Sequence, residues 1–188
     1  MVKTAVFVSG GGTNLQAILD AQGDVIRSAE VALVISNNAN AYALERAAKA
    51  GVKTMVLKAE ADIQQALVDN GIQLIVLAGF MKILSAEFTA RWNHRILNIH
   101  PSLIPSFCGK GMYGLHVHEA ALAKGVKVTG ATVHFVNEVP DGGEIVFQKA
   151  VDVEPGDTPE VLQRRVMEQA EWVLLPRAIE KVAKEIEK

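Results

Sequence analysis

The chain has 188 residues, of which 49% are hydrophobic and 21% charged, and its formal net charge is −2. These values suit one compact domain over residues 1–188 and argue against nucleic-acid binding, which needs a basic face. A single cysteine excludes an internal disulfide framework, and no apolar run reaches the roughly 20 residues that span a bilayer. We therefore expect a cytoplasmic protein with no membrane partner, and the sequence leaves open whether it is a monomer or a homodimer.

Apolar runs alternate with segments of helical periodicity over residues 1–100. Strand-like runs rich in β-branched residues occupy 4–9, 31–36, 53–57, 73–78 and 95–100, and a helical segment follows each of the first four. Continuous apolar strands separated by helices predict an α/β fold with a mostly parallel central sheet and helices on both faces.

The pattern changes after residue 125. Two strand-like runs, 128–136 and 143–153, are joined by "NEVPDGG", in which Pro-Asp-Gly is typical of a turn. We therefore expect an added antiparallel hairpin in place of another crossover.

The C-terminal segment has helical periodicity from Thr158, with Pro159 at the first helical position. Pro176 lies inside this segment and is expected to kink or divide it. The side chains expected to face the core are those of Leu162, Val166 and Val173.

The loop "SGGGTN" (9–14) joins the first strand to the first helix. Its glycines let a ligand approach the backbone, and free N–H groups at a helix start attract an anion. It lacks the Lys-Ser/Thr pair of a triphosphate loop, and Leu15 stands where a dinucleotide fingerprint needs its third glycine. The loop therefore fits a small phosphate, or it is a tight turn capped by Thr13 or Asn14.

The stretch "NIHPSLIPSF" (98–107) ends an apolar strand with two polar residues. Asn98 and His100 are two apart, so both side chains point to one face at the carboxyl end of a strand, where open α/β sheets bind ligands. Taken alone, a buried core histidine and a strand-terminating asparagine are the better explanation of these two residues.

A second polar cluster lies in "ATVHFVNEVPDGG" (131–143). Thr132 and His134 share one face of a predicted strand, and Asp141 follows in the turn. Asp141 is either a turn-forming residue or a carboxylate that stabilises a protonated histidine. An amide, a histidine and a carboxylate together could act in acid–base catalysis and stabilise an oxyanion.

Four motifs, "SGGGTNLQAI" (9–18), "LAGFMKILS" (77–85), "NIHPSLIPSF" (98–107) and "VHFVNEVPDGG" (133–143), follow one another over nearly the whole chain. In this combination the chain resembles phosphoribosylglycinamide formyltransferase. The resemblance implies a single-domain, Rossmann-like formyltransferase fold. It also implies transfer of the formyl group of 10-formyltetrahydrofolate, as cosubstrate, to the amine of phosphoribosylglycinamide in purine biosynthesis, without a metal.

The resemblance also implies roles for individual residues. Asn98, His100 and Asp141 match the catalytic positions, with Thr132 and His134 as their support. The positions that match the binding site for phosphoribosylglycinamide are Gly12, Thr13, Asn14 and Glu171. The positions that match the folate pocket are Met81, Lys82, Ile83, Leu84, Asn98, Val136, Asn137, Glu138, Val139, Pro140 and Asp141.

The chain departs from the family pattern in three places. Segment 57–71 is short and has no arginine for the glutamate tail of folate, and Lys82 replaces a frequent arginine. Trp172 follows Glu171 where a histidine is common, and the helix before it carries an extra residue.

Other residues allow competing interpretations. His116 and His118 have metal-ligand spacing, but no third ligand lies nearby, so helix-start polarity or loop packing is the better interpretation. Cys108 is expected to be an inert thiol and not a nucleophile. Two related enzymes, methionyl-tRNA formyltransferase and formyltetrahydrofolate hydrolase, usually carry an additional domain for which this chain offers no room. A non-catalytic nucleotide-binding module would explain the glycine loop but not Asn98, His100 and Asp141 together.

Overall fold

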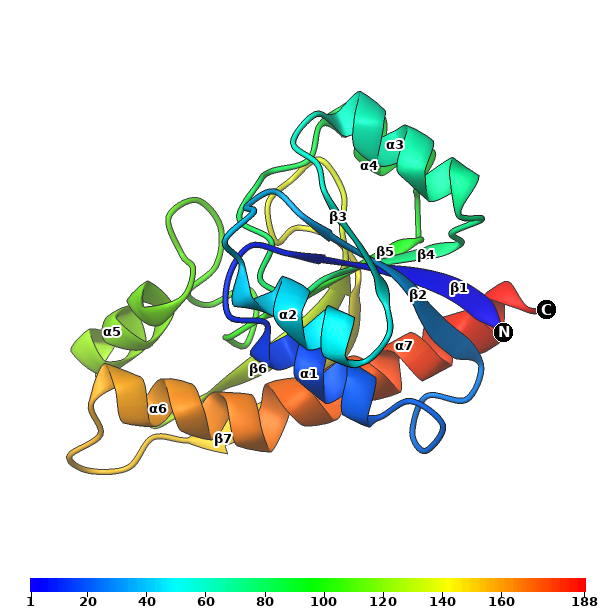
Figure 1. Ribbon diagram of the computed structural model, residues 1–188. Coiled ribbons are helices and arrows are strands. Elements are labelled where there is room, and N and C mark those ends of the chain that lie inside the picture. The colour runs from blue at the N-terminus through cyan, green and yellow to red at the C-terminus, as the bar shows by residue number, and fades with distance from the viewer.

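Strands and helices alternate over residues 1–100 in the computed structural model, which describes residues 1–188 (Figure 1). The strands are β1 (Val2–Val8), β2 (Ala29–Ser36), β3 (Lys53–Val56), β4 (Leu74–Leu77) and β5 (Ile96–His100). The helices between them are α1 (Thr13–Asp20), α2 (Tyr42–Lys49), α3 (Glu60–Asp69) and α4 (Ala86–Arg91). Each strand overlaps the apolar run that predicts it.

The seven strands form one sheet in the order β3-β2-β1-β4-β5-β6-β7. β1 to β5 pair in parallel, whereas β6 (Val128–Phe135) pairs antiparallel with both β5 and β7 (Ile145–Asp152). The predicted mostly parallel sheet and its added antiparallel hairpin are therefore confirmed. Helix α5 (Leu115–Lys124) precedes β6.

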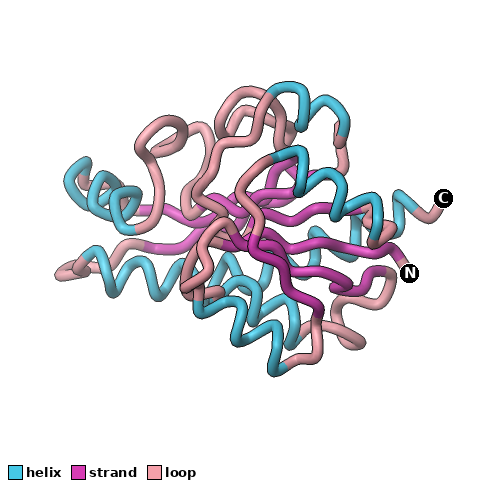
Figure 2. Tube along the Cα trace, turned by 45° about the horizontal axis from the view of Figure 1, so that its top comes forward, coloured by secondary structure: helices cyan, strands magenta, loops and turns pink.

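Helices cover both faces of the sheet, as Figure 2 shows, and each face has its own apolar cluster. Val6 and Val8 of β1 pack into the cluster shared with α1 and α2, while Ala5 and Phe7 pack into the cluster shared with α3 and α4. Because successive strand residues point to opposite faces, a strand covered on both sides is apolar at every position. This explains the continuous apolar runs of the central strands.

None of the helices is both long and apolar enough to cross a lipid bilayer.

The C-terminal segment contains helix α6 (Pro159–Val166), a π-helical turn η1 (Met167–Glu171) and helix α7 (Trp172–Ile186). Thr158 caps α6 and Pro159 begins it, as expected. Pro176 does not divide the segment, because α7 runs through it, and the irregular turn lies before it. A proline ring inside a helix crowds the carbonyl four residues before it, which here belongs to Trp172. Trp172 directly follows the wider π turn, so the backbone there has room for the Pro176 ring.

The π turn also corrects one predicted core residue. Leu162 and Val166 are fully buried, as expected, but Val173 is 37% exposed. A π turn inserts one residue into the α-helical repeat, so the buried face moves on by one position beyond it. Leu174 takes the place in the core that simple α periodicity gives to Val173.

Candidate active site

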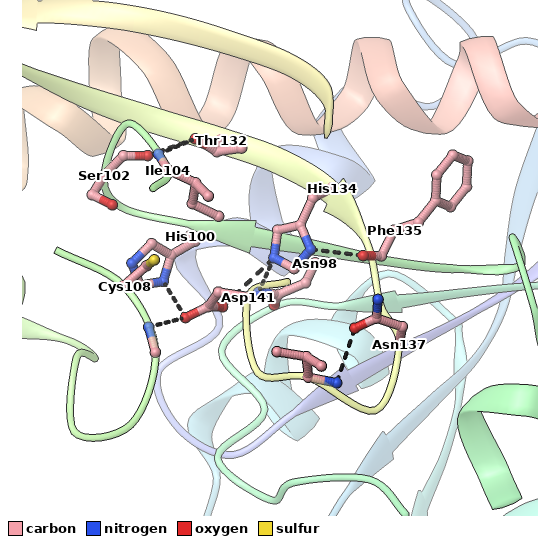
Figure 3. Close-up of polar contacts among 12 residues, drawn as sticks. Asn98, His100, Ser102, Ile104, Cys108, Thr132, His134, Phe135, Asn137 and Asp141 are labelled. Atoms are coloured by element: carbon pink, nitrogen blue, oxygen red, sulfur yellow. Dashed lines mark hydrogen bonds and ion pairs between the residues drawn. The ribbon is translucent and has the colours of Figure 1, made fainter. Parts of the chain in front are cut away.

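Four polar side chains meet on one face of strands β5 and β6. In β5, Leu97 and Ile99 pack into the cluster under α1 and α7, so Asn98 and His100 point to the opposite face. The antiparallel register sets Asn98 directly opposite His134 and His100 directly opposite Thr132. The two polar clusters of the sequence are therefore cross-strand neighbours, as Figure 3 shows.

His134 holds the amide of Asn98. The Nδ1 atom of His134 lies 2.7 Å from the carbonyl oxygen of Phe135, which can only accept, so Nδ1 carries the proton (Figure 3). The Nε2 atom is then an acceptor, and the Nδ2 group of Asn98 donates to it at 3.1 Å. The second N–H of the same Asn98 nitrogen remains available for a ligand.

His100 lies between a backbone carbonyl and a carboxylate, and its side chain is almost fully buried. Its Nε2–H donates to the carbonyl oxygen of Phe107 at 2.9 Å, and its Nδ1 lies 3.6 Å from Oδ2 of Asp141. With Nε2 protonated, a proton on Nδ1 gives an imidazolium that faces the carboxylate. One ring nitrogen therefore faces a backbone carbonyl and the other faces the Asp141 carboxylate.

Asp141 reaches these rings from the turn between β6 and β7. Its backbone has a positive φ of 56°, which aspartate tolerates better than most residues. Oδ2 accepts from the Gly109 N–H at 2.8 Å, and Oδ1 lies 3.6 Å from Nε2 of His134. Burial alone raises the pKa of Asp141, but its partners, among them the Gly109 N–H and His100, outweigh burial and hold the pKa below its usual value. Asp141 is therefore ionised at neutral pH.

Thr132 fastens the loop after β5 to the sheet. Its hydroxyl donates to the Ser102 carbonyl at 2.7 Å and accepts from the Ile104 N–H at 3.1 Å (Figure 3). Gln148 of β7 donates to the same oxygen at 3.0 Å. Since this loop carries the Phe107 carbonyl that holds His100, Thr132 acts on the ring through the loop.

A cavity of about 130 Å³ opens beside these groups. Its lining comes from the ends of β4 and β5, the segment after β4, and the turn after β6. The lining residues are Leu77, Phe80, Lys82, Ile83, Leu84, Asn98, His134, Val136, Asn137, Glu138, Val139, Pro140 and Asp141.

Every residue predicted for the folate pocket except Met81 lines this cavity. The side chain of Met81 is 55% exposed, and its N–H donates to the Ser9 hydroxyl at 2.9 Å. Leu77 and Phe80 line the cavity and were missed as site residues. The sequence could have identified both, because they lie in "LAGFMKILS" at the carboxyl end of a predicted parallel strand, where such sheets bind ligands.

The glycine loop begins helix α1 without a side-chain cap. Gly12 is the N-cap residue in a left-handed conformation, with φ of 74°, and a Cβ atom there would lie 2.6 Å from Cβ of Ala43. The alternative in which Thr13 or Asn14 caps the turn is therefore wrong, because both lie inside the helix and neither caps it. The first N–H groups of the helix remain unpaired and can receive an anion.

Glu171 lies against this loop although it is 157 residues from Asn14. Asn14 Nδ2 donates to Glu171 Oε2 at 2.7 Å, and Asn14 Oδ1 is buried without a partner. The π turn ends at Glu171 and directs its side chain inward. Burial, only partly offset by the bond from Asn14, raises the pKa of Glu171 from 4.5 to about 7.

The remaining chemically active side chains have other environments. His116 is exposed and lies 3.0 Å from Glu119, whereas His118 is fully buried with neither ring nitrogen bonded. Burial, reinforced by His100, lowers the pKa of His118 to about 4, which keeps it neutral. Burial and the Asp141 charge raise the pKa of the Cys108 thiol, so it is a poor nucleophile at neutral pH.

Three parts of the site lie side by side at one edge of the sheet. The glycine loop follows β1, the segment 79–84 follows β4, and Asn98 and His100 end β5, and these three strands are neighbours. The Ser9 N–H bonds the Gly79 carbonyl at 3.1 Å and links the first two parts directly. The carboxyl ends of parallel strands thus bring the glycine loop close to Asn98 and His100.

Comparisons with known proteins identify the family of this chain. The family model described as formyl transferase matches residues 2–179. A phosphoribosylglycinamide formyltransferase of Haemophilus influenzae is 44% identical over 95% of this chain and 86% of its own length. The human trifunctional purine biosynthetic protein adenosine-3 is 44% identical over 96% of this chain.

Solved structures extend the similarity to the fold. Glycinamide ribonucleotide transformylase 1 from Symbiobacterium toebii superposes with a TM-score of 0.90 at 42% identity, over 98% of this chain and 89% of that one. Against the trifunctional relatives from chicken, human and cattle, this chain spans 18% of the relative's length. The match covers almost all of this chain and most of the single-function relatives, so the predicted membership is confirmed: the chain belongs to the formyl transferase family.

Proposed function

We propose that this protein transfers the formyl group of 10-formyltetrahydrofolate to the amino group of phosphoribosylglycinamide. The observation that carries the proposal is the meeting of Asn98, His100 and Asp141 beside a cavity at the carboxyl end of β5. Relatives that bear the name of this activity align over most of the chain. The glycine loop, one strand away, supports a phosphorylated acceptor.

The catalytic step is a direct attack of the acceptor amine on the formyl carbon. A carbon–nitrogen bond forms, negative charge develops on the formyl oxygen, and the bond from carbon to N10 of the folate then breaks. The free N–H of Asn98 donates to that oxygen. Both nitrogens of His100 face protein groups, so this ring would act on the oxygen through its positive charge and not through a hydrogen bond. Donors already directed at a developing oxyanion typically contribute on the order of 100-fold or more in rate.

Asp141 acts on the protonation of this centre. Its carboxylate lies 3.6 Å from His100 Nδ1, so positive charge on that ring would face a negative charge. The attacking amine loses a proton and N10 of the folate gains one. Because the Asp141 carboxylate lines the cavity, it can accept the proton from the amine and return it to N10.

The acceptor would bind at the glycine loop. Its phosphate fits the unpaired N–H groups of Gly12, Thr13 and Asn14, and its ribose hydroxyls would be bound by Glu171 and by the unpartnered Oδ1 of Asn14. A reduced folate would occupy the cavity between 82–84 and 136–141, whose lining combines apolar and polar residues.

The test compares acceptors under identical conditions. Purified protein is incubated with 10-formyltetrahydrofolate and with phosphoribosylglycinamide, formyl-acceptor tRNA or water alone, and formylated product and free formate are measured. We expect formylation of phosphoribosylglycinamide, and Asn98→Ala should lower turnover about 100-fold while ligand binding persists. Preferred formylation of tRNA, or formate release without acceptor, would overturn the proposal.

A further inference from the structure

Arg46 of α2 is the one charged side chain bonded to the backbone of the glycine loop. Its Nε–H donates to the Gly11 carbonyl at 2.8 Å, and its Nη1 group donates to Gln16 Oε1 of α1 at 3.1 Å. The guanidinium is thereby fixed at two points, between the loop and the helix that the loop begins. The sequence offered no signal for this contact.

A second bond from α2 acts on the neighbouring peptide. The N–H of Ala43 donates to the Gly10 carbonyl at 3.0 Å. The carbonyls of Gly10 and Gly11 therefore both point to α2. In a trans peptide the N–H points opposite to the carbonyl, so the N–H groups of Gly11 and Gly12 point away from α2.

These N–H groups join the open start of α1. Gly11, Gly12 and the first three residues of α1 make no hydrogen bond through their N–H groups, and the first turn of α1 has no acidic residue. Five consecutive backbone donors are thus free on the side of the loop that faces away from α2. Such an arrangement binds an anion only while the flexible glycine peptides keep their orientation.

We infer that Arg46 is a positioning residue for the acceptor phosphate: by holding the Gly11 carbonyl it keeps the Gly11–Gly12 peptide turned so that its N–H faces the anion. The inference rests on the proposed function, and it assigns the arginine no direct contact with the reacting atoms. Without Arg46 the Gly11–Gly12 peptide can rotate and present its carbonyl to the phosphate.

The chain offers a matched control. Lys49 lies on the same helix and, like Arg46, places its charge over the Tyr42 ring, at 5.7 Å against 5.0 Å for Arg46. Lys49 makes no bond to the loop. Lys49→Met therefore removes one positive charge near the site without removing the carbonyl contact.

The kinetic test compares the wild type with Arg46→Met, Arg46→Lys and Lys49→Met. Both Arg46 variants should raise the KM for phosphoribosylglycinamide about tenfold, with kcat and the KM for the folate near wild type. Lys49→Met should leave all three constants unchanged. Full recovery in Arg46→Lys would show that charge alone suffices and would overturn the inference, as would a wild-type KM in Arg46→Met.

A binding test separates this inference from the proposed function. Ribose 5-phosphate, but not ribose, should raise the Tm of the wild type and of Lys49→Met, and both Arg46 variants should need about tenfold more ribose 5-phosphate for the same rise. An equal rise in all four proteins would overturn the inference. One outcome is that the wild type does not formylate phosphoribosylglycinamide while the Arg46 variants still bind ribose 5-phosphate more weakly than the wild type does. In that case the proposed function fails and the role of Arg46 stands.

Discussion

Asp141 combines two properties that are usually found in separate residues. Its positive φ suits a turn former, and its buried carboxylate faces two histidines while accepting the Gly109 N–H. Asparagine tolerates the same backbone conformation and can accept the same N–H, but it carries no charge. One substitution therefore separates turn formation from electrostatic support.

We predict that Asp141→Asn keeps the fold but lowers turnover about 100-fold at neutral pH. The substitution removes the negative charge that lies 3.6 Å from His100 Nδ1 and leaves the turn intact. The measurement is the pH–rate profile beside that of wild type, with circular dichroism to verify the fold. Glu144 is an exposed carboxylate near the same turn, so Glu144→Gln serves as the control. If Asp141→Asn has the pH–rate profile and turnover of the wild type, Asp141 is a turn residue only.

Glu171 gives a prediction about stability. Its pKa rises from 4.5 to about 7 in the folded protein, mainly through burial, so the folded state keeps a proton that the unfolded chain releases. Its contribution to stability is therefore fully present below pH 4.5 and is lost as pH rises through about 7.

Glu171→Gln should be more stable than wild type at pH 8, by on the order of 3 kcal/mol in the free energy of unfolding. The advantage should shrink as pH falls toward 4.5, where the wild-type carboxyl is neutral in both states. Urea unfolding at several pH values measures it, with the exposed Glu168→Gln as control. A difference that does not vary with pH would mean that Glu171 is ionised in the folded state.

At the scale of elements, side-chain hydrogen bonds that link neighbouring strands and loops hold the site together. The Thr132 hydroxyl of β6 ties down the loop after β5 through Ser102 and Ile104, and Gln148 of β7 joins the same oxygen. Three elements thus depend on one buried oxygen atom, and the loop that they hold positions His100.

Thr132→Val preserves the shape but leaves a buried N–H and a buried carbonyl without partners. We expect it to lower the free energy of unfolding by about 2–3 kcal/mol, whereas Thr132→Ser, which keeps the hydroxyl, should lose much less. Urea unfolding compares the two. Because His100 is held through this loop, turnover should also fall in Thr132→Val, and equal stability of both variants would remove Thr132 as the link.

At the scale of the whole molecule, one continuous sheet joins two apolar clusters. Trp92 lies in the cluster under α3 and α4, while Trp172 begins α7 on the opposite face. Strands β1, β2, β4 and β5 each contribute side chains to both apolar clusters, so the helices on one face cannot unfold while those on the other face keep their packing.

We predict that residues 1–188 unfold as one cooperative domain. In Trp92→Phe and Trp172→Phe, the remaining tryptophan reports one face of the sheet. For each variant, the fluorescence midpoint in urea should coincide with the midpoint from circular dichroism. Fluorescence that changes well before circular dichroism in either variant would show that the two faces unfold separately.

The sequence alone determined the order and type of the elements, because strands covered on both faces need continuous apolar runs and helices covered on one face need a 3.6-residue period. It also predicted that Asn98 and His100 share a face, since strand alternation is strictly local. The tertiary structure decided the rest. The β5–β6 register sets His134 against Asn98, the π turn moves Val173 out of the core and directs Glu171 to Asn14, and Arg46 reaches Gly11. These contacts join residues distant in the chain, and their formation depends on how layers pack, which no local periodicity records.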